Sequence, residues 1–306
     1  MLNYTEALTV LARDITSRVP ALSFLDIDRM LIFGRVGRGD VEGANASCHC
    51  LCLPEDEPGY YFWRDEATGV VTRRTEWFVA RTPVVQRTGT RLDYLISVAL
   101  PRFCDQRLGH GRKAAFYPGA EAYVAKLDTL VHELYHIDPQ RQGIRPLPDA
   151  CDGAGAGRQH SEAFYRDVAG FVRTYLQSQP DPAIYEFLRY DFAGLRARYG
   201  SVVATAFRNF PSYPQIYLER LAEQPAGPDT AVIVPVKVPR QPVRYADADI
   251  MIREFSAHGS RRLRVADLRS TAAAAVPLPE VAPAAFAGAG ARGARFTPVS
   301  HDTLGA

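Results

Sequence analysis

Apolar residues recur at helical spacing in four segments of the chain. Residues 3–18 place five of them on one face, and Pro20 follows as a stop signal. The clearest pattern covers residues 121–137, and Pro139 ends it. Its apolar stripe consists of Val124, Leu127, Val131 and Leu134. Residues 161–177 predict another amphipathic helix, and residues 183–199 predict a further helical piece.

Short runs of β-branched and aromatic residues between turn signals predict strands. These runs cover residues 29–35, 44–53, 77–81 and 92–100. Residues 231–239 have strand propensity interrupted by prolines, and residues 250–257 and 261–267 predict a hairpin around His258-Gly259-Ser260. Residues 102–118 give no clear pattern. From Thr271 onward Ala, Pro and Gly dominate, which predicts a disordered tail.

These elements predict an α+β protein with three parts. Residues 1–200 form a first domain, which contains the helix at 121–137. Residues 201–270 form a β-rich C-terminal extension with the hairpin, and residues 271–306 form the low-complexity tail. A chain of 306 residues, 47% hydrophobic and 23% charged, is long enough for a substantial core.

Charge and cysteine content indicate the compartment and the partners. A formal net charge of +2 does not favour nucleic acid or membrane binding by the chain as a whole. Five cysteines, three of them in Cys48-His49-Cys50-Leu51-Cys52, make a poor disulfide framework and favour a reducing environment. The N-terminal residues lack a signal-peptide pattern, and no apolar stretch could span a bilayer. We therefore expect a cytoplasmic protein without a membrane partner; the oligomeric state stays open.

The decisive motif is His132-Glu133-Leu134-Tyr135-His136, inside the clearest predicted helix. Residues four apart lie on one helix face, so His132 and His136 can present both imidazoles to one metal ion. Glu133 beside them is placed to act as a general base on a metal-bound water. Histidine ligands with an open fourth position are typical of catalytic zinc, so we expect Zn²⁺ as the cofactor.

A catalytic zinc site normally needs a third protein ligand. His160 is the best candidate, because it follows a Gly-rich loop and opens the next amphipathic helix, in which Phe164 would anchor it. Glu162 is the main alternative, although acidic residues are common in first helical turns. Asp138, Asp149 and Asp152 are weaker alternatives with turn chemistry.

Several other residues carry possible chemistry. Cys48, Cys50 and Cys52 at alternate strand positions could bind a soft metal or act in redox chemistry, but we favour small buried side chains in a strand. The run Arg261-Arg262-Leu263-Arg264 could contact phosphate, and a solvated hairpin strand is the simpler interpretation. Candidate transition-state stabilisers are Tyr135, Tyr165 and Arg158.

The motif HELYH, followed by His160-Ser161-Glu162-Ala163-Phe164, resembles the SprT-like zinc metallopeptidases. In that family HExxH precedes a third histidine in an HGxxF-type sequence at the start of the next helix. Residues 1–200 also resemble a set of uncharacterised bacterial and phage metallopeptidases, in the segments 21–30, 44–53 and 94–103. Ser161 stands where the SprT pattern has Gly, and no CxxC pair follows His160 to form the zinc ribbon common in that family.

The resemblance implies a zincin-like α+β domain, in which a small sheet packs against the active-site helix. It also implies that His132, His136 and His160 hold zinc and that Glu133 is the general base. It implies a metallopeptidase that hydrolyses peptide bonds in a protein or peptide substrate. One alternative is a catalytically inactive, zinc-stabilised binding or scaffold protein. Another is a DNA-associated SprT-like protein, which neither the modest net charge nor the missing zinc ribbon favours.

Overall fold

The computed structural model describes residues 1–52, 58–59, 62–64, 71–74, 78–109, 112–140, 143–145, 160–209, 213–222 and 243–263. In this part of the chain helices and small mixed sheets are combined, so the expected α+β class is confirmed. The α-helices are α1 (Tyr4–Arg18), α2 (Arg112–Phe116), α3 (Tyr123–Tyr135), α4 (Glu162–Gln177), α5 (Pro182–Tyr185) and α6 (Phe192–Tyr199). Short 3₁₀ helices lie at Pro20–Leu22, Ile27–Arg29, Glu186–Arg189 and Asp247–Asp249.

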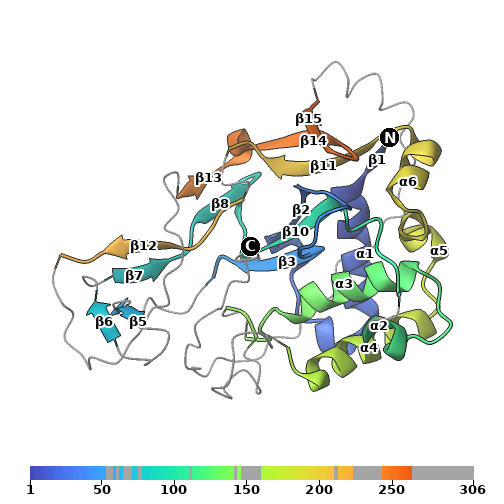
Figure 1. Cartoon of the computed structure of the whole chain (residues 1–306), viewed down its shortest axis with the longest axis horizontal. Helices are drawn as coiled ribbons and strands as arrows, with labels where there is room; N and C mark the ends of the chain where they lie inside the picture. Colours follow the sequence, from blue (N-terminus) through green and yellow to red (C-terminus); the bar gives the residue numbers. More distant parts are fainter. Residues whose placement is uncertain are drawn as a thin grey trace.

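The described strands form five sheets (Figure 1). The two that build the core contain β1 (Leu2–Asn3), β2 (Met30–Gly37), β3 (Ala46–Cys50), β10 (Tyr94–Pro101), β11 (Val202–Phe207), β14 (Ile250–Ser256) and β15 (Gly259–Arg262). The smaller sheets contain β4 (Pro58–Gly59), β5 (Phe62–Arg64), β6 (Val71–Arg74), β7 (Phe78–Arg81), β8 (Val84–Arg87), β9 (Thr90–Arg91), β12 (Tyr217–Arg220) and β13 (Arg244–Tyr245).

The central sheet has the order β2-β10-β3. β10 runs parallel to β2 and antiparallel to β3, with Ile96 opposite both Ile32 and Cys48. Every residue of β10 is buried, as expected for a central strand with both faces covered. β3 lies at the edge of this sheet and packs against α3 (Figure 1), so the sheet supports the helix that carries the HExxH motif.

A second sheet, in the order β1-β11-β14-β15, joins the two ends of the described chain. β11 follows residue 200, yet it pairs in parallel with β1 at the N terminus. The sheet approaches β2 closely at Gly34, where an added Cβ would lie 2.9 Å from both Ala204 and Phe255. Glycine at this position therefore lets the two sheets pack together.

Helices α1 and α3 pack against the strands, α4 packs against these two helices, and all three share the main hydrophobic core (Figure 1). A polar contact also connects α1 to α4. Asp14 accepts hydrogen bonds of 2.7 Å from both the Tyr175 hydroxyl and Arg18 Nε. Asp14 is only 2% exposed and Tyr175 is fully buried, so the two helices are joined by a satisfied buried carboxylate.

Most of the predicted elements are confirmed, with shifts at their ends. The predicted helices at 3–18, 121–137 and 161–177 correspond to α1, α3 and α4. The predicted strands at 29–35, 77–81 and 92–100 correspond to β2, β7 and β10, and the strand at 44–53 is confirmed in the shorter form of β3. Residues 231–239 and the tail from 271 onward lie outside the described residues.

Two predictions of local structure are wrong in detail. The helical piece at 183–199 is interrupted, because Tyr190 is extended and Asp191 starts α6 by accepting a hydrogen bond from Gly194 N at 2.8 Å. The hairpin is confirmed, but its turn is Ala257-His258, so β15 already begins at Gly259. The unassigned segment 102–118 contains the short helix α2.

Candidate metal centre

Two histidines of the HExxH motif face the same direction at the C-terminal end of α3. This helix forms because its apolar positions are buried against the core, and His136 is its C-cap residue. His132 and His136 are one turn apart, and their Nε2 atoms lie 3.1 Å from each other. The helical spacing has therefore brought both imidazole nitrogens to one point.

His160 brings the third imidazole from the start of α4. Its Nε2 lies 2.9 Å from His136 Nε2. The position is fixed by Ser161, the N-cap residue, whose Oγ accepts a hydrogen bond from Phe164 N at 3.1 Å. Ser161, which replaces the Gly of the SprT pattern, thus holds the first turn of the helix directly after His160.

Phe164 packs against all three histidines of this cluster. Its ring centroid lies 5.0 Å from that of His132, 5.0 Å from that of His136 and 4.9 Å from that of His160. The side chain is only 3% exposed. One buried aromatic ring therefore contacts all three imidazoles and limits their rotation.

The three histidines fit a zinc ion. Among the described residues they form a group of potential metal ligands whose donor atoms all lie within 4.8 Å of one another. Two nitrogens bound tetrahedrally to one zinc ion would lie about 3.3 Å apart, and the two Nε2–Nε2 distances of 3.1 and 2.9 Å are close to this spacing.

In one respect the site differs from many metal sites. His136 Nδ1 is buried and has no hydrogen-bond partner within the described residues, whereas metal-bound histidines commonly donate such a bond.

The charge state of His136 suits metal binding. Burial, together with the nearby charges of His160 and Arg145, lowers the pKa of His136 to about 3. The ring is therefore neutral at neutral pH, the state in which imidazole binds metals. Arg145 also completes the end of α3, because its Nε donates to Tyr135 O at 2.8 Å.

Glu133 lies on α3 next to His132 and faces the sheet. The carboxylate accepts a hydrogen bond from the backbone N–H of Cys48 in β3, and the residue is 6% exposed. Burial raises the pKa of Glu133 to about 7, although Cys48 and the positive charges of Lys113 and Arg35 lower it. A carboxyl group with a pKa in this range can accept and return a proton near neutral pH.

The two other candidate ligands that the structure describes, Glu162 and Asp138, are not part of the cluster. Glu162 is exposed and forms an ion pair with Arg166 at 2.7 Å. Asp138 accepts a hydrogen bond from Gln140 N at 3.2 Å, which is turn chemistry. Asp149 and Asp152 lie outside the described residues.

Of the candidate stabilising residues, Tyr165 packs beside the histidines. Its ring centroid is 5.4 Å from that of His160 and 5.9 Å from that of His132. The Tyr135 hydroxyl instead donates to Asp167 Oδ2 at 2.8 Å. Arg158 lies outside the described residues.

Among the described residues, neither Cys48, Cys50 and Cys52 nor the arginines of the hairpin join the histidine cluster. Cys50 is buried, and Cys48 and Cys52 are partly buried against the main core. Arg261 forms an ion pair with Glu254 at 2.5 Å, and Arg262 is exposed. Leu263 is described, but Arg264 is not.

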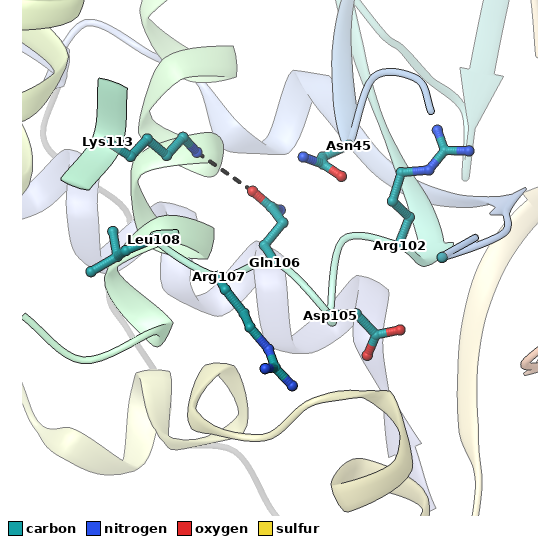
Figure 2. A pocket seen from close by; sticks show the side chains of 8 residues that line it. Asn45, Arg102, Asp105, Gln106, Arg107, Leu108 and Lys113 are labelled. Carbon is teal, nitrogen blue, oxygen red and sulfur yellow. Dashed lines mark hydrogen bonds between the residues drawn. The ribbon is translucent and has the colours of Figure 1, made fainter. Parts of the chain in front are cut away.

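A cavity of about 530 Å³ lies elsewhere, around the loop after β10 (Figure 2). Three cationic residues are part of its lining, Arg102, Arg107 and Lys113, together with Asp105. Figure 2 shows Lys113 and Gln106 pointing toward each other, at 3.5 Å. Lys113 also forms an ion pair with Asp128 of α3 at 2.8 Å, so its charge is already compensated. The three histidines do not line this cavity.

Arg145 and Lys113 were not predicted from the sequence, because both contact α3 from outside its periodic pattern. No described helix has the length and apolar character needed to cross a bilayer.

The chain was compared with family models, curated proteins and solved structures. None of the three comparisons finds a match.

Proposed function

We propose that the chain is a zinc-dependent metallopeptidase with a zincin-like catalytic domain. The observation that carries this proposal is the convergence of three imidazole nitrogens, two from successive turns of α3 and one from the start of α4. In this proposal His132, His136 and His160 would hold the zinc ion, and zinc bound there would supply a site that activates water.

Glu133 is the proposed general base. It follows a zinc ligand directly, it is buried, and its pKa is raised into the neutral range. When bound, zinc supplies a Lewis acid that lowers the pKa of water and polarises a substrate carbonyl. Glu133 then accepts a proton from the water and passes it to the leaving amine. A buried carboxyl group with a pKa near 7, directly after a proposed zinc ligand, favours an enzyme over a scaffold.

The test combines metal analysis with a peptide-library cleavage assay. We expect equimolar zinc in the wild-type chain, in Glu133→Gln and in the control Glu162→Gln. Cleavage should persist in Glu162→Gln and fall by about 10²–10⁴-fold in Glu133→Gln. Full activity of Glu133→Gln would refute its role as base.

A second pair of variants tests the ligands. His160→Ala should lose most of its zinc, whereas the exposed His258→Ala on the β14–β15 turn should retain it. Full zinc occupancy in His160→Ala would remove His160 from the ligand set. Equimolar zinc with no cleavage of any peptide by the wild-type chain would support the scaffold alternative.

A further inference from the structure

Two cysteine thiols touch at the end of the edge strand β3. The Sγ atoms of Cys50 and Cys52 lie 3.7 Å apart, and the backbone N–H of Cys52 donates to Cys50 Sγ at 3.2 Å. No disulfide joins cysteines within the described residues. Cys50 is buried and Cys52 is partly exposed, so only one member of the pair is open to reagents.

The environment makes these two thiols chemically different. A hydrogen bond from the Cys50 thiol lowers the pKa of Cys52, and the Tyr94 hydroxyl and the backbone of Gly143 lower it further. The same thiol–thiol hydrogen bond, together with burial, raises the pKa of Cys50. Cys52 therefore favours the thiolate form, which is the nucleophile in thiol–disulfide exchange.

We propose that Cys50 and Cys52 are a reversible redox site that closes to a disulfide in exchange with a small-molecule disulfide. The Cys52 thiolate attacks one sulfur of the small disulfide, which forms a mixed disulfide and releases one small thiolate. Cys50 then loses its proton and attacks Cys52 Sγ, which releases the second small thiolate. The protein pair is oxidised by two electrons, and the small disulfide is reduced to two thiols that take up two protons.

The geometry permits this closure without long-range movement. The two sulfurs must approach from 3.7 Å to about 2.05 Å. Cys52 lies beyond the last residue of β3, so the change falls on the bend at Leu51, whose backbone N–H donates to Asp93 O at 2.7 Å. A ring that contains one intervening residue is strained, and strained disulfides are the easily reduced, regulatory ones.

The thiol pair is connected to the histidine cluster through residues 143–145. Cys52 O accepts a hydrogen bond from Gly143 N at 3.2 Å, and the Tyr94 hydroxyl donates to Gly143 O at 2.9 Å. At the other end of this segment, Arg145 N donates to His136 O at 2.7 Å. We therefore expect oxidation of the pair to change zinc binding at His136, an effect that rests on the proposed function.

The first experiment tests the disulfide alone, in the full chain with Cys151→Ser as background because Cys151 lies outside the described residues. The reduced protein is incubated with glutathione disulfide, and its thiols and intact mass are followed. We expect the loss of two thiols and of two hydrogen atoms in mass, with no glutathione retained. The control Cys48→Ser should behave in the same way.

Two single variants separate the roles of the pair. Cys50→Ser should stop at a glutathione adduct on Cys52, and Cys52→Ser should react about tenfold more slowly, at the rate of ordinary buried thiols. Retention of all thiols by the background protein, or equal thiol loss in Cys52→Ser, would overturn the proposal.

The second experiment measures zinc affinity by competition with a chelator, in the oxidised and reduced chain. We expect weaker binding only when Cys50 and Cys52 are joined, and no redox effect in Cys50→Ser after removal of the adduct. Equal affinities would refute the connection to His136 and leave the disulfide established by mass. If neither form binds zinc, the proposed function fails, and the disulfide is still decided by the thiol count.

Discussion

Phe164 should control zinc affinity without being a ligand. We consider Phe164→Leu, which keeps an apolar side chain in the core and removes the aromatic ring beneath the three imidazoles. The ring centroids of the three histidines lie 4.9–5.0 Å from that of Phe164, where each aromatic pair contributes about 0.5–1.5 kcal/mol beyond the buried area. These contacts exist with and without zinc. They therefore change the zinc affinity only because they hold the imidazole rings in the orientation that zinc binding requires.

The expected loss is that of an outer partner which orients metal ligands, about 10–100-fold in zinc affinity. This range corresponds to about 1.4–2.8 kcal/mol. It does not exceed the sum of the three ring contacts, about 1.5–4.5 kcal/mol, so the ring contacts are large enough to supply it. The metal-free protein should also lose stability, by about 0.5–3 kcal/mol, because the ring contacts are lost there too and leucine fills only part of the volume.

The assay is competition for zinc with a fluorescent chelator, together with thermal unfolding of the metal-free protein. Phe171→Leu is the matched control, since Phe171 lies on the same helix, is partly buried and packs against Tyr135 at 5.0 Å. Both variants should lower the unfolding midpoint, and only Phe164→Leu should weaken zinc binding. Zinc affinity of Phe164→Leu indistinguishable from wild type would refute the view that packing orders the imidazoles.

Three further predictions address the cap, the metal and the core. Ser161→Ala should destabilise the protein by about 1 kcal/mol and Ser161→Gly by only a few tenths, because glycine is tolerated at an N-cap; equal midpoints for both variants would contradict the capping role. Removal of zinc by a chelator should lower the unfolding midpoint, since a ligand at 100 times its Kd stabilises by about 2.7 kcal/mol. This shift should disappear in His160→Ala, and an unchanged midpoint in the wild-type chain would argue against a bound metal. Asp14→Ala should cost about 1–3 kcal/mol, measured by urea unfolding, because the buried Tyr175 hydroxyl loses its acceptor. The exposed Asp40→Ala serves as its control and should leave the urea midpoint unchanged.

The sequence predicted best where one periodic pattern decides the structure. The apolar stripe of residues 121–137 became α3, and the four-residue spacing of His132 and His136 alone implies that both rings share a face. His160 was a weaker inference, because nothing in a linear pattern shows that α4 returns to the end of α3. The structure brings these helices together through Phe164, whose ring contacts imidazoles from both of them.

Other features depend on contacts that no local pattern contains. β11 was missed although Val202–Phe207 is entirely buried, because a short apolar run can belong to either a strand or a helix. The break in residues 183–199 depends on Asp191, whose side chain caps a new helix inside an apparently continuous pattern. Short-range propensity and helix capping compete there, and capping determines the result.

The cysteine run shows how a correct structural interpretation can miss chemistry. Alternation along a strand predicted that Cys48, Cys50 and Cys52 share one face as small buried side chains, and all three do pack against the main core. The strand, however, ends at Cys50, and the bend at Leu51 turns Cys52 back until its sulfur touches that of Cys50. A regular strand would separate side chains two residues apart by about 6.6 Å. The reactive arrangement therefore arises from the end of the strand, at a boundary that sequence patterns locate least well.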